Sequence, residues 1–478
     1  MDLILAIDFG STYTKVVAFD LANEEVLGVV QSESTVETDV TIGLESALIR
    51  LQDALKIEPL AANRILACSS AAGGLRMIVA GLVRDLTTKA AQEACLGAGA
   101  KLVAAYSNGL VLEDINQIEQ IWPDIILLTG GTDGGNEEVI LNNAKLVAES
   151  RLDSPVVIAG NRRAAARAKS SMEAGGKYAV IAENVLPEID RLNVEPTRAV
   201  IRDIFMARIV KAKGLDRAKE IIGDIIMPTP MAVLNAATLL AEGAEGTEGL
   251  GELVVVDIGG ATTDIHSVAR GAPVLPGTLV RGLPEPYRKR TVEGDLGIRY
   301  NARSILELVG EQRIKELLPN PYREGLHSLN LLEVTELLSR CTGKVPVDDR
   351  DHQVDVGLAT AAVDVAMKRH AGTIEEIYLP SGKVLIQRGK DLKDIKCIIG
   401  TGGIFAYGRL PGWILSAGCY DEVRPESLRP LQPDMFIDER YIMFAIGLLA
   451  EEHPGKALRI MKKSLRKVEN ENDQRRRG

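Results

Sequence analysis

The sequence is poor in the residues from which disulfide frameworks and metal centres are built. Its 478 residues include only five cysteines and five histidines. The cysteines are scattered without a C-x-x-C pair, and the histidines show no metal-ligand spacing. This pattern argues against disulfides, zinc and iron–sulfur sites and is typical of buried thiols in a reducing compartment.

Long apolar runs and an excess of positive charge are also missing. No stretch approaches the ~20 apolar residues that a membrane-spanning helix requires, and the chain enters an apolar strand at Leu3 without a basic signal region. The formal net charge is −10, which disfavours nucleic acid or an anionic membrane as the main partner. We therefore expect a cytoplasmic protein with no nucleic-acid or membrane partner.

Two widespread phosphate-binding fingerprints are absent as well. Neither G-x-x-x-x-G-K-[ST] nor G-x-G-x-x-G occurs in the chain, so P-loop and Rossmann interpretations lose their main support. Aromatic residues make up only 4% of the chain, whereas glycine occurs 45 times. This composition suits an α/β protein with many tight turns, and the length allows two or more domains.

The sequence does contain one motif that occurs twice. An apolar run near the start leads into Asp8-Phe9-Gly10-Ser11-Thr12-Tyr13-Thr14-Lys15, and another near the middle leads into Asp257-Ile258-Gly259-Gly260-Ala261-Thr262-Thr263-Asp264. When the two are aligned, the first aspartates, the first glycines and the threonines Thr14 and Thr263 coincide. Each copy predicts a strand, a glycine-containing turn and a second strand, which together form a hairpin.

This hairpin has a chemical use. Glycine in the turn lets backbone N–H groups approach an anion, and the serine and threonine hydroxyls add donors around phosphate oxygens. A carboxylate beside them can hold hydrated Mg²⁺ or orient an attacking water. Two such hairpins that face each other would grip the phosphates of a nucleotide from both sides.

Between the hairpins, strands and helices alternate. A strand at 124–128 ends in the turn T-G-G-T-D-G-G-N at 129–136, and a helix at 137–150, a strand at 155–159 and a helix at 162–171 follow. This alternation implies parallel pairing, with ligands at the carboxyl ends of the strands. The 129–136 turn therefore either contacts a ligand or only lets the chain leave the sheet.

Two segments after the second hairpin stand out by their glycines. The segment 281–297 is rich in glycine and charge, and it is either a functional loop near a cleft or an ordinary connector. Further on, a strand at 394–399 leads into Gly400-Thr401-Gly402-Gly403. Two adjacent glycines after a buried strand let a flat ring or a ribose lie against the backbone.

Taken in order, the two aspartate hairpins and the paired glycines resemble the superfamily of actin, heat-shock chaperones and sugar kinases. The resemblance implies an α/β, two-lobed actin-like ATPase (ribonuclease H-like) fold with an α/β insertion in the first lobe. It assigns residues 1–240 to the first lobe, including an α/β segment at about 113–200, and residues 250–450 to the second. Residues 451–478 are expected to form a charged tail.

A closer resemblance covers residues 1 to roughly 450. The opening A-I-D-F-G-S-T-Y-T-K, the L-L-T-G-G-T-D-G-G-N at 127–136, V-D-I-G-G-A-T-T-D, and T-V-E-G-D-L-G at 291–297 are similar to the glutamate mutase accessory protein family. That family implies an ATP-dependent reactivating chaperone that removes damaged cobalamin. Its expected partner is an adenosylcobalamin-dependent mutase, glutamate mutase or a related aminomutase, and a homo-oligomer is left open.

The resemblance also implies roles for individual residues toward ATP or ADP and Mg²⁺. Asp8 and Asp257 would hold Mg²⁺ through water, Asp257 would also orient the attacking water, and Lys15 would supply positive charge for the transferring phosphoryl group. The motif residues implied to contact the nucleotide are Gly10, Ser11, Thr12, Tyr13, Gly259, Gly260, Ala261, Thr262, Thr263, Gly402 and Gly403.

Two other functions fit the same superfamily. A small-molecule kinase would place its acceptor near 281–297 and use Asp257 or Asp295 as the base. A nucleotide-gated scaffold or filament protein would need no acceptor. Release of ADP that depends on an acceptor would indicate the kinase, and light scattering that depends on nucleotide would indicate the filament.

Overall fold

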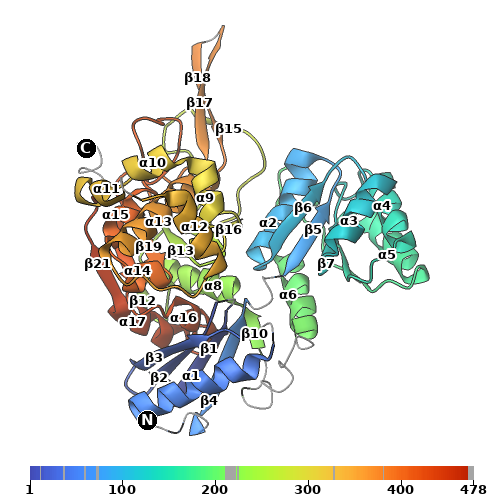
Figure 1. Ribbon diagram of the computed structural model, residues 1–478. Coiled ribbons are helices and arrows are strands. Elements are labelled where there is room, and N and C mark those ends of the chain that lie inside the picture. Colours follow the sequence, from blue (N-terminus) through green and yellow to red (C-terminus); the bar gives the residue numbers. More distant parts are fainter. Residues whose placement is uncertain are drawn as a thin grey trace.

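The computed structural model describes residues 1–478 except 11, 36–37, 57, 59–60, 71–74, 210–221, 223–224, 327–328, 381 and 472–478. The first lobe is built on a five-stranded sheet in the order β10-β4-β1-β2-β3 (Figure 1). Its strands are β1 (Leu3–Phe9), β2 (Tyr13–Asp20), β3 (Glu25–Glu33), β4 (Arg64–Ser69) and β10 (Ile225–Pro228). The first three form an antiparallel meander, and β4 joins β1 in parallel.

The second lobe repeats this arrangement in a six-stranded sheet, in the order β16-β14-β13-β19-β20-β21. Its strands are β13 (Leu253–Ile258), β14 (Thr263–Val268), β16 (Arg288–Glu293), β19 (Cys397–Thr401), β20 (Asp434–Asp438) and β21 (Leu465–Val468). Here too a three-stranded antiparallel meander is extended from its first strand by parallel strands. The first five strands of each lobe therefore share one order.

A third sheet lies between β4 and β10 in the chain. All five of its strands are parallel, in the order β6-β5-β7-β8-β9. They are β5 (Arg76–Ala80), β6 (Lys101–Tyr106), β7 (Ile125–Leu128), β8 (Val156–Ile158) and β9 (Ala179–Ile181). Because β5 and β6 belong to this sheet, the α/β segment extends upstream of residue 113 to Arg76.

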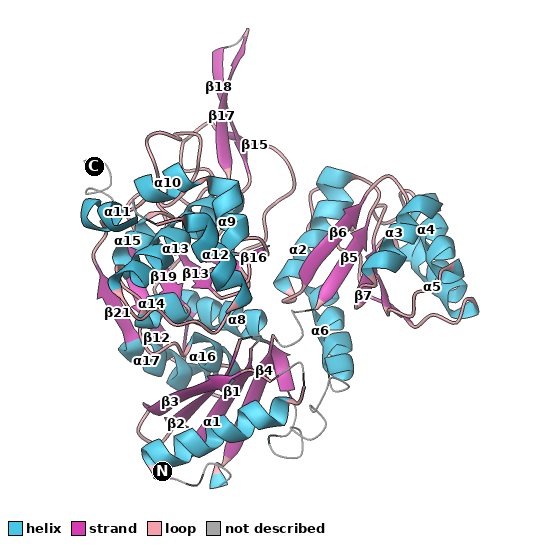
Figure 2. Ribbon diagram, in the orientation of Figure 1, coloured by secondary structure: helices cyan, strands magenta, loops and turns pink. Residues whose placement is uncertain are grey.

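Helices cover both faces of this inserted sheet, so its strands are apolar on both sides. The π-helical turn η3 (Arg84–Thr88) precedes α2. The helices are α2 (Lys89–Gly97), α3 (Leu112–Ile121), α4 (Glu138–Glu149), α5 (Arg162–Ala174) and α6 (Glu195–Ile209). We call this doubly wound unit, β5 to α6, the inserted domain (Figure 2).

The two lobes share one hydrophobic core. Alternate residues of β1 and β13 face a cluster that contains α8 (Thr229–Glu242), α16 (Met443–Leu449) and α17 (Pro454–Ser464). The first two of these helices cross so closely that a Cβ on Gly447 would lie 1.8 Å from the Ala232 carbonyl oxygen. These two helices therefore form a close contact within the core that the lobes share.

The outer faces of the two main sheets carry the remaining helices. Helix α1 (Val40–Leu55) covers the first sheet. The second is covered mainly by α13 (Asp349–His370) together with α9 (Ala302–Val309), α10 (Glu311–Glu316), α11 (Asn320–Leu326), α12 (Leu331–Arg340), α14 (Gly403–Tyr407) and α15 (Pro411–Ser416). Short strands β11 (Gly243–Ala244) and β12 (Thr247–Glu248) form a small hairpin, and β15 (Leu279–Val280) joins the projecting hairpin of β17 (Thr373–Leu379) and β18 (Gly382–Arg388) (Figure 1).

The structure corrects the expected charged tail at 451–478 over residues 451–471, and residues 472–478 lie outside the described part of the chain. Within it, α17 packs its apolar side into the shared core, and β21 adds an antiparallel strand to β20. The run of charges hid the buried residues Leu458 and Met461, which recur at helical spacing. Throughout the described part of the chain, no helix has both the length and the apolarity to cross a membrane.

Candidate functional site

The two aspartate motifs fold as hairpins with the same register. Asp8 lies opposite Lys15 in the first hairpin, and Asp257 lies opposite Asp264 in the second. In each turn the first glycine donates its N–H to a carbonyl three residues on, from Gly10 to Tyr13 at 3.1 Å and from Gly259 to Thr262 at 2.9 Å. The repeat seen in the sequence is therefore a repeat in geometry.

The two turns face each other across the space between the lobes. A Cβ on Gly260 would lie 3.3 Å from the Thr12 hydroxyl oxygen, so residues from opposite lobes are near contact. Beside them is a cavity of about 460 Å³, a volume within the range of small-molecule sites. The predicted residues that line it are Asp8, Gly10, Thr12, Tyr13, Lys15, Asp257, Gly259, Gly260, Ala261, Thr262 and Gly403.

Asp8 is fixed by cationic and hydroxyl donors. Lys15 Nζ donates to Asp8 Oδ2 at 2.9 Å, and the Thr229 hydroxyl donates to Oδ1 at 2.6 Å. Lys15 Nζ also lies 4.0 Å from the centre of the Tyr441 ring. Burial alone would lower the pKa of Lys15, but its interactions with Tyr441 and Asp8 raise it above the ordinary value, so the side chain stays charged.

Asp257 has a different environment, because its cross-strand neighbour Asp264 is a second acid. Burial, together with the negative charge of Asp264, raises the pKa of Asp257 to about 7. Asp264 in turn accepts a hydrogen bond from Arg290 at 2.8 Å through Oδ2. Its buried Oδ1 has no hydrogen-bond partner in the part of the chain that the structure describes.

These carboxylates fit a hydrated cation. Two neighbouring acids, one with a raised pKa and one with a buried oxygen that has no hydrogen-bond partner in the described chain, would be stabilised by a positive charge placed beside them. Among the described residues, no group of three or more histidine, cysteine, aspartate or glutamate side chains is arranged to hold a metal ion directly.

Two of the predicted contact residues, Thr263 and Gly402, do not line the cavity. Thr263 is a correction, because its fully buried hydroxyl donates to the Leu296 carbonyl at 2.7 Å rather than lining the cavity. Side chains alternate along a strand, so Thr262 and Asp264 reach the cavity and Thr263 points into the core. Ser11 lies outside the described residues.

Gly402 supports the cavity without lining it. Its φ is +112°, and a Cβ there would lie 2.3 Å from the Ile258 carbonyl oxygen, so only glycine lets β19 turn into α14 at this point. The neighbouring Gly403 does line the cavity, and a Cβ on it would have no atom within 4 Å.

Several lining residues were not anticipated from the sequence. At one end of the cavity, Arg299 donates to both oxygens of Asp355, at 2.8 and 2.7 Å. The backbone N–H of Arg299 donates to the Gly260 carbonyl at 2.9 Å, which ties this arginine to the second turn. The other unanticipated lining residues include Thr229, Asp264, Lys344, His352, Tyr407 and Tyr441.

The segment 281–297 leads to this end of the cavity. It contains β16 and then a turn whose Gly297 packs against Ala261, where a Cβ would come within 2.2 Å of a backbone carbon. Asp295, the alternative base for a kinase, pairs with Arg369 at 2.9 and 3.0 Å and does not line the cavity.

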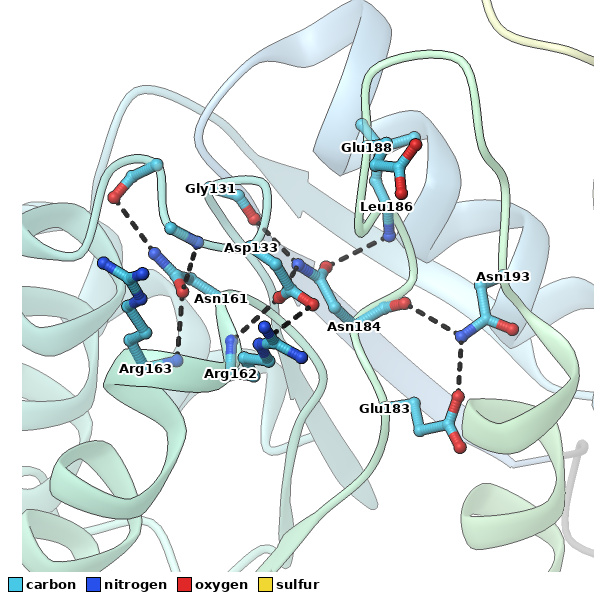
Figure 3. Close-up of polar contacts among 12 residues, drawn as sticks. Gly131, Asp133, Asn161, Arg162, Arg163, Glu183, Asn184, Leu186, Glu188 and Asn193 are labelled. Atoms are coloured by element: carbon cyan, nitrogen blue, oxygen red, sulfur yellow. Dashed lines mark hydrogen bonds and ion pairs between the residues drawn. The ribbon is translucent and has the colours of Figure 1, made fainter.

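The 129–136 turn lies away from this cavity, at the carboxyl end of β7 in the inserted domain (Figure 3). Asn161 donates to the carbonyls of Gly135 and Asn136 and accepts from the N–H of Gly134. Asn184 donates to the Gly131 carbonyl and to Asp133. Two asparagines from the neighbouring strand ends thus hold the turn in place.

Two lobes with one strand order, each contributing a matched aspartate hairpin to a shared cleft, define the actin-like ATPase and sugar-kinase fold class. The chain is similar to a glycerol dehydratase reactivase (TM-score 0.34, 11% identity, 94% of this chain and 99% of that one). It is also similar to xylulose kinase from Bifidobacterium adolescentis (TM-score 0.30, 12% identity, 95% and 92%).

Sequence comparison is more specific. The family model described as "MutL protein" matches residues 4–465. The chain is 45% identical to Protein MutL of Clostridium tetanomorphum over 468 residues, which is 98% of this chain and 100% of that protein. The chain therefore belongs to the MutL protein family, the glutamate mutase accessory family that its motifs resemble.

Proposed function

We propose that this protein binds and hydrolyses ATP with Mg²⁺ and reactivates an adenosylcobalamin-dependent mutase, glutamate mutase or a related aminomutase. Nucleotide-driven motion of the two lobes promotes release of damaged cobalamin from that partner. One observation carries the nucleotide half of this proposal: the two matched hairpins face each other, with Thr12 beside Gly260, over a single cavity. Membership of the MutL protein family supports the mutase half.

The residues of the cleft suit phosphoryl transfer to water. The turn N–H groups and the hydroxyls of Thr12 and Thr262 surround the phosphates, and Lys15 adds a fixed positive charge. Asp257 orients the water and accepts its proton, a role for which a pKa of about 7 is well matched. Asp8 and Asp257, with Asp264 beside them, would hold Mg²⁺ through water, and the ion would supply positive charge beside the phosphates.

The same arrangement converts hydrolysis into motion. A nucleotide that contacts both turns holds the lobes together, and loss of the γ-phosphate removes part of that link. The lobes then pivot where α8 and α16 cross, at Ala232 and Gly447. A mutase responds to this motion only if it binds one lobe arrangement more tightly than the other.

Hydrolysis by purified protein tests the catalytic half. We expect Asp257→Asn to lower the rate of Mg·ATP hydrolysis by about 100-fold or more, because the base is lost. Asp295→Asn is the matched control: it changes an acid of the same lobe that lies outside the cavity, and its rate should stay within about twofold of wild type. ADP release that requires a small acceptor, or that depends on Asp295, would favour the kinase and overturn the proposal.

A further inference from the structure

The inserted domain docks on the edge strand β16 of the second lobe, although the chain enters it from the first lobe (Figure 1). The contact is rich in ion pairs. Lys89 of α2 pairs with Glu285 at 2.8 Å, and Glu195 of α6 pairs with Arg288 at 3.1 Å. The inserted domain is therefore attached to the first lobe by the chain and to the second lobe by these contacts.

Arg290 lies at the centre of this contact, and only 3% of its surface is exposed. On one side its guanidinium donates to Asp264 in the second hairpin at 2.8 Å. On the other side it donates to the carbonyls of Leu96, in the last turn of α2, at 3.1 Å and of Ala100 at 3.4 Å. A single side chain thus joins the candidate nucleotide site to the inserted domain.

We propose that Arg290 is a positioning residue that couples nucleotide occupancy to the docking of the inserted domain. This inference rests on the proposed function, because it requires Mg·nucleotide in the cleft. It adds a route by which that nucleotide acts on a domain that does not line the cleft.

The coupling follows from competition for Asp264. In the described chain, Asp264 Oδ1 and Arg290 Nε are both buried without hydrogen-bond partners, so neither group is fully satisfied. A positive charge bound beside Asp257 also attracts the Asp264 carboxylate. This attraction weakens the hydrogen bond between Asp264 and the Arg290 guanidinium. The C-terminus of α2 carries partial negative charge on its last carbonyls. The guanidinium then interacts more strongly with α2, and docking of the inserted domain tightens.

Hydrogen exchange measured by mass spectrometry tests this on the full-length chain. Peptides covering residues 89–100 report on α2, with and without Mg²⁺ and a non-hydrolysable ATP analogue, and calorimetry on the same samples measures nucleotide binding. In wild type we expect nucleotide to slow exchange in these peptides about fivefold, the lower end of measured coupling between sites.

Two variants and a control separate coupling from a merely structural role. Arg290→Gln removes the charge. Arg290→Lys keeps the charge but lacks the planar guanidinium that contacts both Asp264 and the end of α2. It is the variant to measure if Arg290→Gln does not fold. Both should reduce the nucleotide-dependent change to less than about twofold. Arg288→Gln also weakens docking, but it has no contact with Asp264 and should keep the wild-type response.

The outcomes test the coupling through Arg290 and nucleotide binding separately. Retention of the full response in both Arg290 variants would overturn the inference, as would nucleotide binding by wild type with unchanged exchange at 89–100. Failure of wild type to bind nucleotide in calorimetry would overturn the proposed function first, and the inference with it.

Discussion

At the scale of single residues, the two motif aspartates have matching positions but unequal chemistry. Asp8 accepts hydrogen bonds from the Lys15 ammonium and the Thr229 hydroxyl. Asp257 faces Asp264 and titrates near neutrality. The difference arises from one substitution between the copies, because Lys15 in the first hairpin is matched by Asp264 in the second. The first hairpin is therefore suited to neutralise charge and the second to accept a proton.

The raised pKa of Asp257 predicts a dependence of stability on pH in the nucleotide-free protein. The folded state keeps this proton up to about pH 7, whereas the unfolded state loses it near pH 4, so this contribution to stability is lost as the pH rises through about 7. Between pH 6 and pH 8 the loss from this group is about 1 kcal/mol. Urea denaturation of wild type and Asp257→Asn at both pH values measures it. Equal pH slopes in the two proteins would contradict the assignment.

The hydrogen bond from Thr229 to Asp8 predicts the effect of a substitution on stability. Thr229→Val keeps the side-chain volume but leaves Asp8 Oδ1 without its 2.6 Å hydroxyl donor. We expect a loss of about 1.5 kcal/mol in the free energy of unfolding, together with weaker nucleotide binding. The control is Thr238→Val in the same helix, where the hydroxyl only donates back to the Leu234 carbonyl and the expected loss is below about 0.5 kcal/mol. Similar losses in both variants would argue against a special role for Thr229.

At the scale of elements, the adjacent glycines between β19 and α14 have separate tasks. Gly402→Ala should destabilise the fold by about 3 kcal/mol, because the new Cβ would meet the Ile258 carbonyl and the backbone has a positive φ. Gly403→Ala should change stability by less than about 0.5 kcal/mol and weaken nucleotide binding, since its Cβ would enter the cavity. Thermal unfolding and calorimetry on the pair check this. Comparable stability in the two variants would contradict it.

The sequence could predict those helices and strands whose pattern of apolar residues and glycines lies within one short segment. The two hairpins follow from apolar strands around a glycine turn, and both form in the structure. Strands β7 and β8 and helices α4 and α5 lie at the predicted positions, with bounds that differ by at most three residues. Strand β5 was missed because it is short and lies directly after the glycine-rich stretch at 70–75. The C-terminal α17 and β21 were missed because charges outnumber their buried apolar residues.

The site was harder to predict where it depends on distant parts of the chain. Asp264 was visible in the aligned motif, yet its role depends on lying opposite Asp257, which makes it a second acid in the cleft. Thr229 and Arg299 reach the cavity only because separate elements fold against the hairpins, and their local sequence gives no signal of this. Thr263 was misassigned because alternation along β14 turns its side chain into the core.

At the scale of the whole molecule, the two lobes form the cleft and the inserted domain contacts the second lobe outside it. The lobes share a core at α8 and α16, and the inserted domain rests on the strand next to the second hairpin. On the proposed function, a nucleotide that bridges the hairpins would control both the angle between the lobes and the position of the inserted domain. A partner that contacts any two of these units would sense the nucleotide.

Recovery of activity by a damaged mutase is the most direct test of ATP-dependent reactivation by this protein. A candidate adenosylcobalamin-dependent mutase is inactivated by turnover and then incubated with this protein, Mg²⁺, ATP and fresh cofactor. We expect recovery that requires ATP, that is lost with Asp257→Asn and that is retained with Asp295→Asn. Hydrolysis without recovery of any mutase tested, but stimulated by a small acceptor, would contradict it and identify a kinase instead.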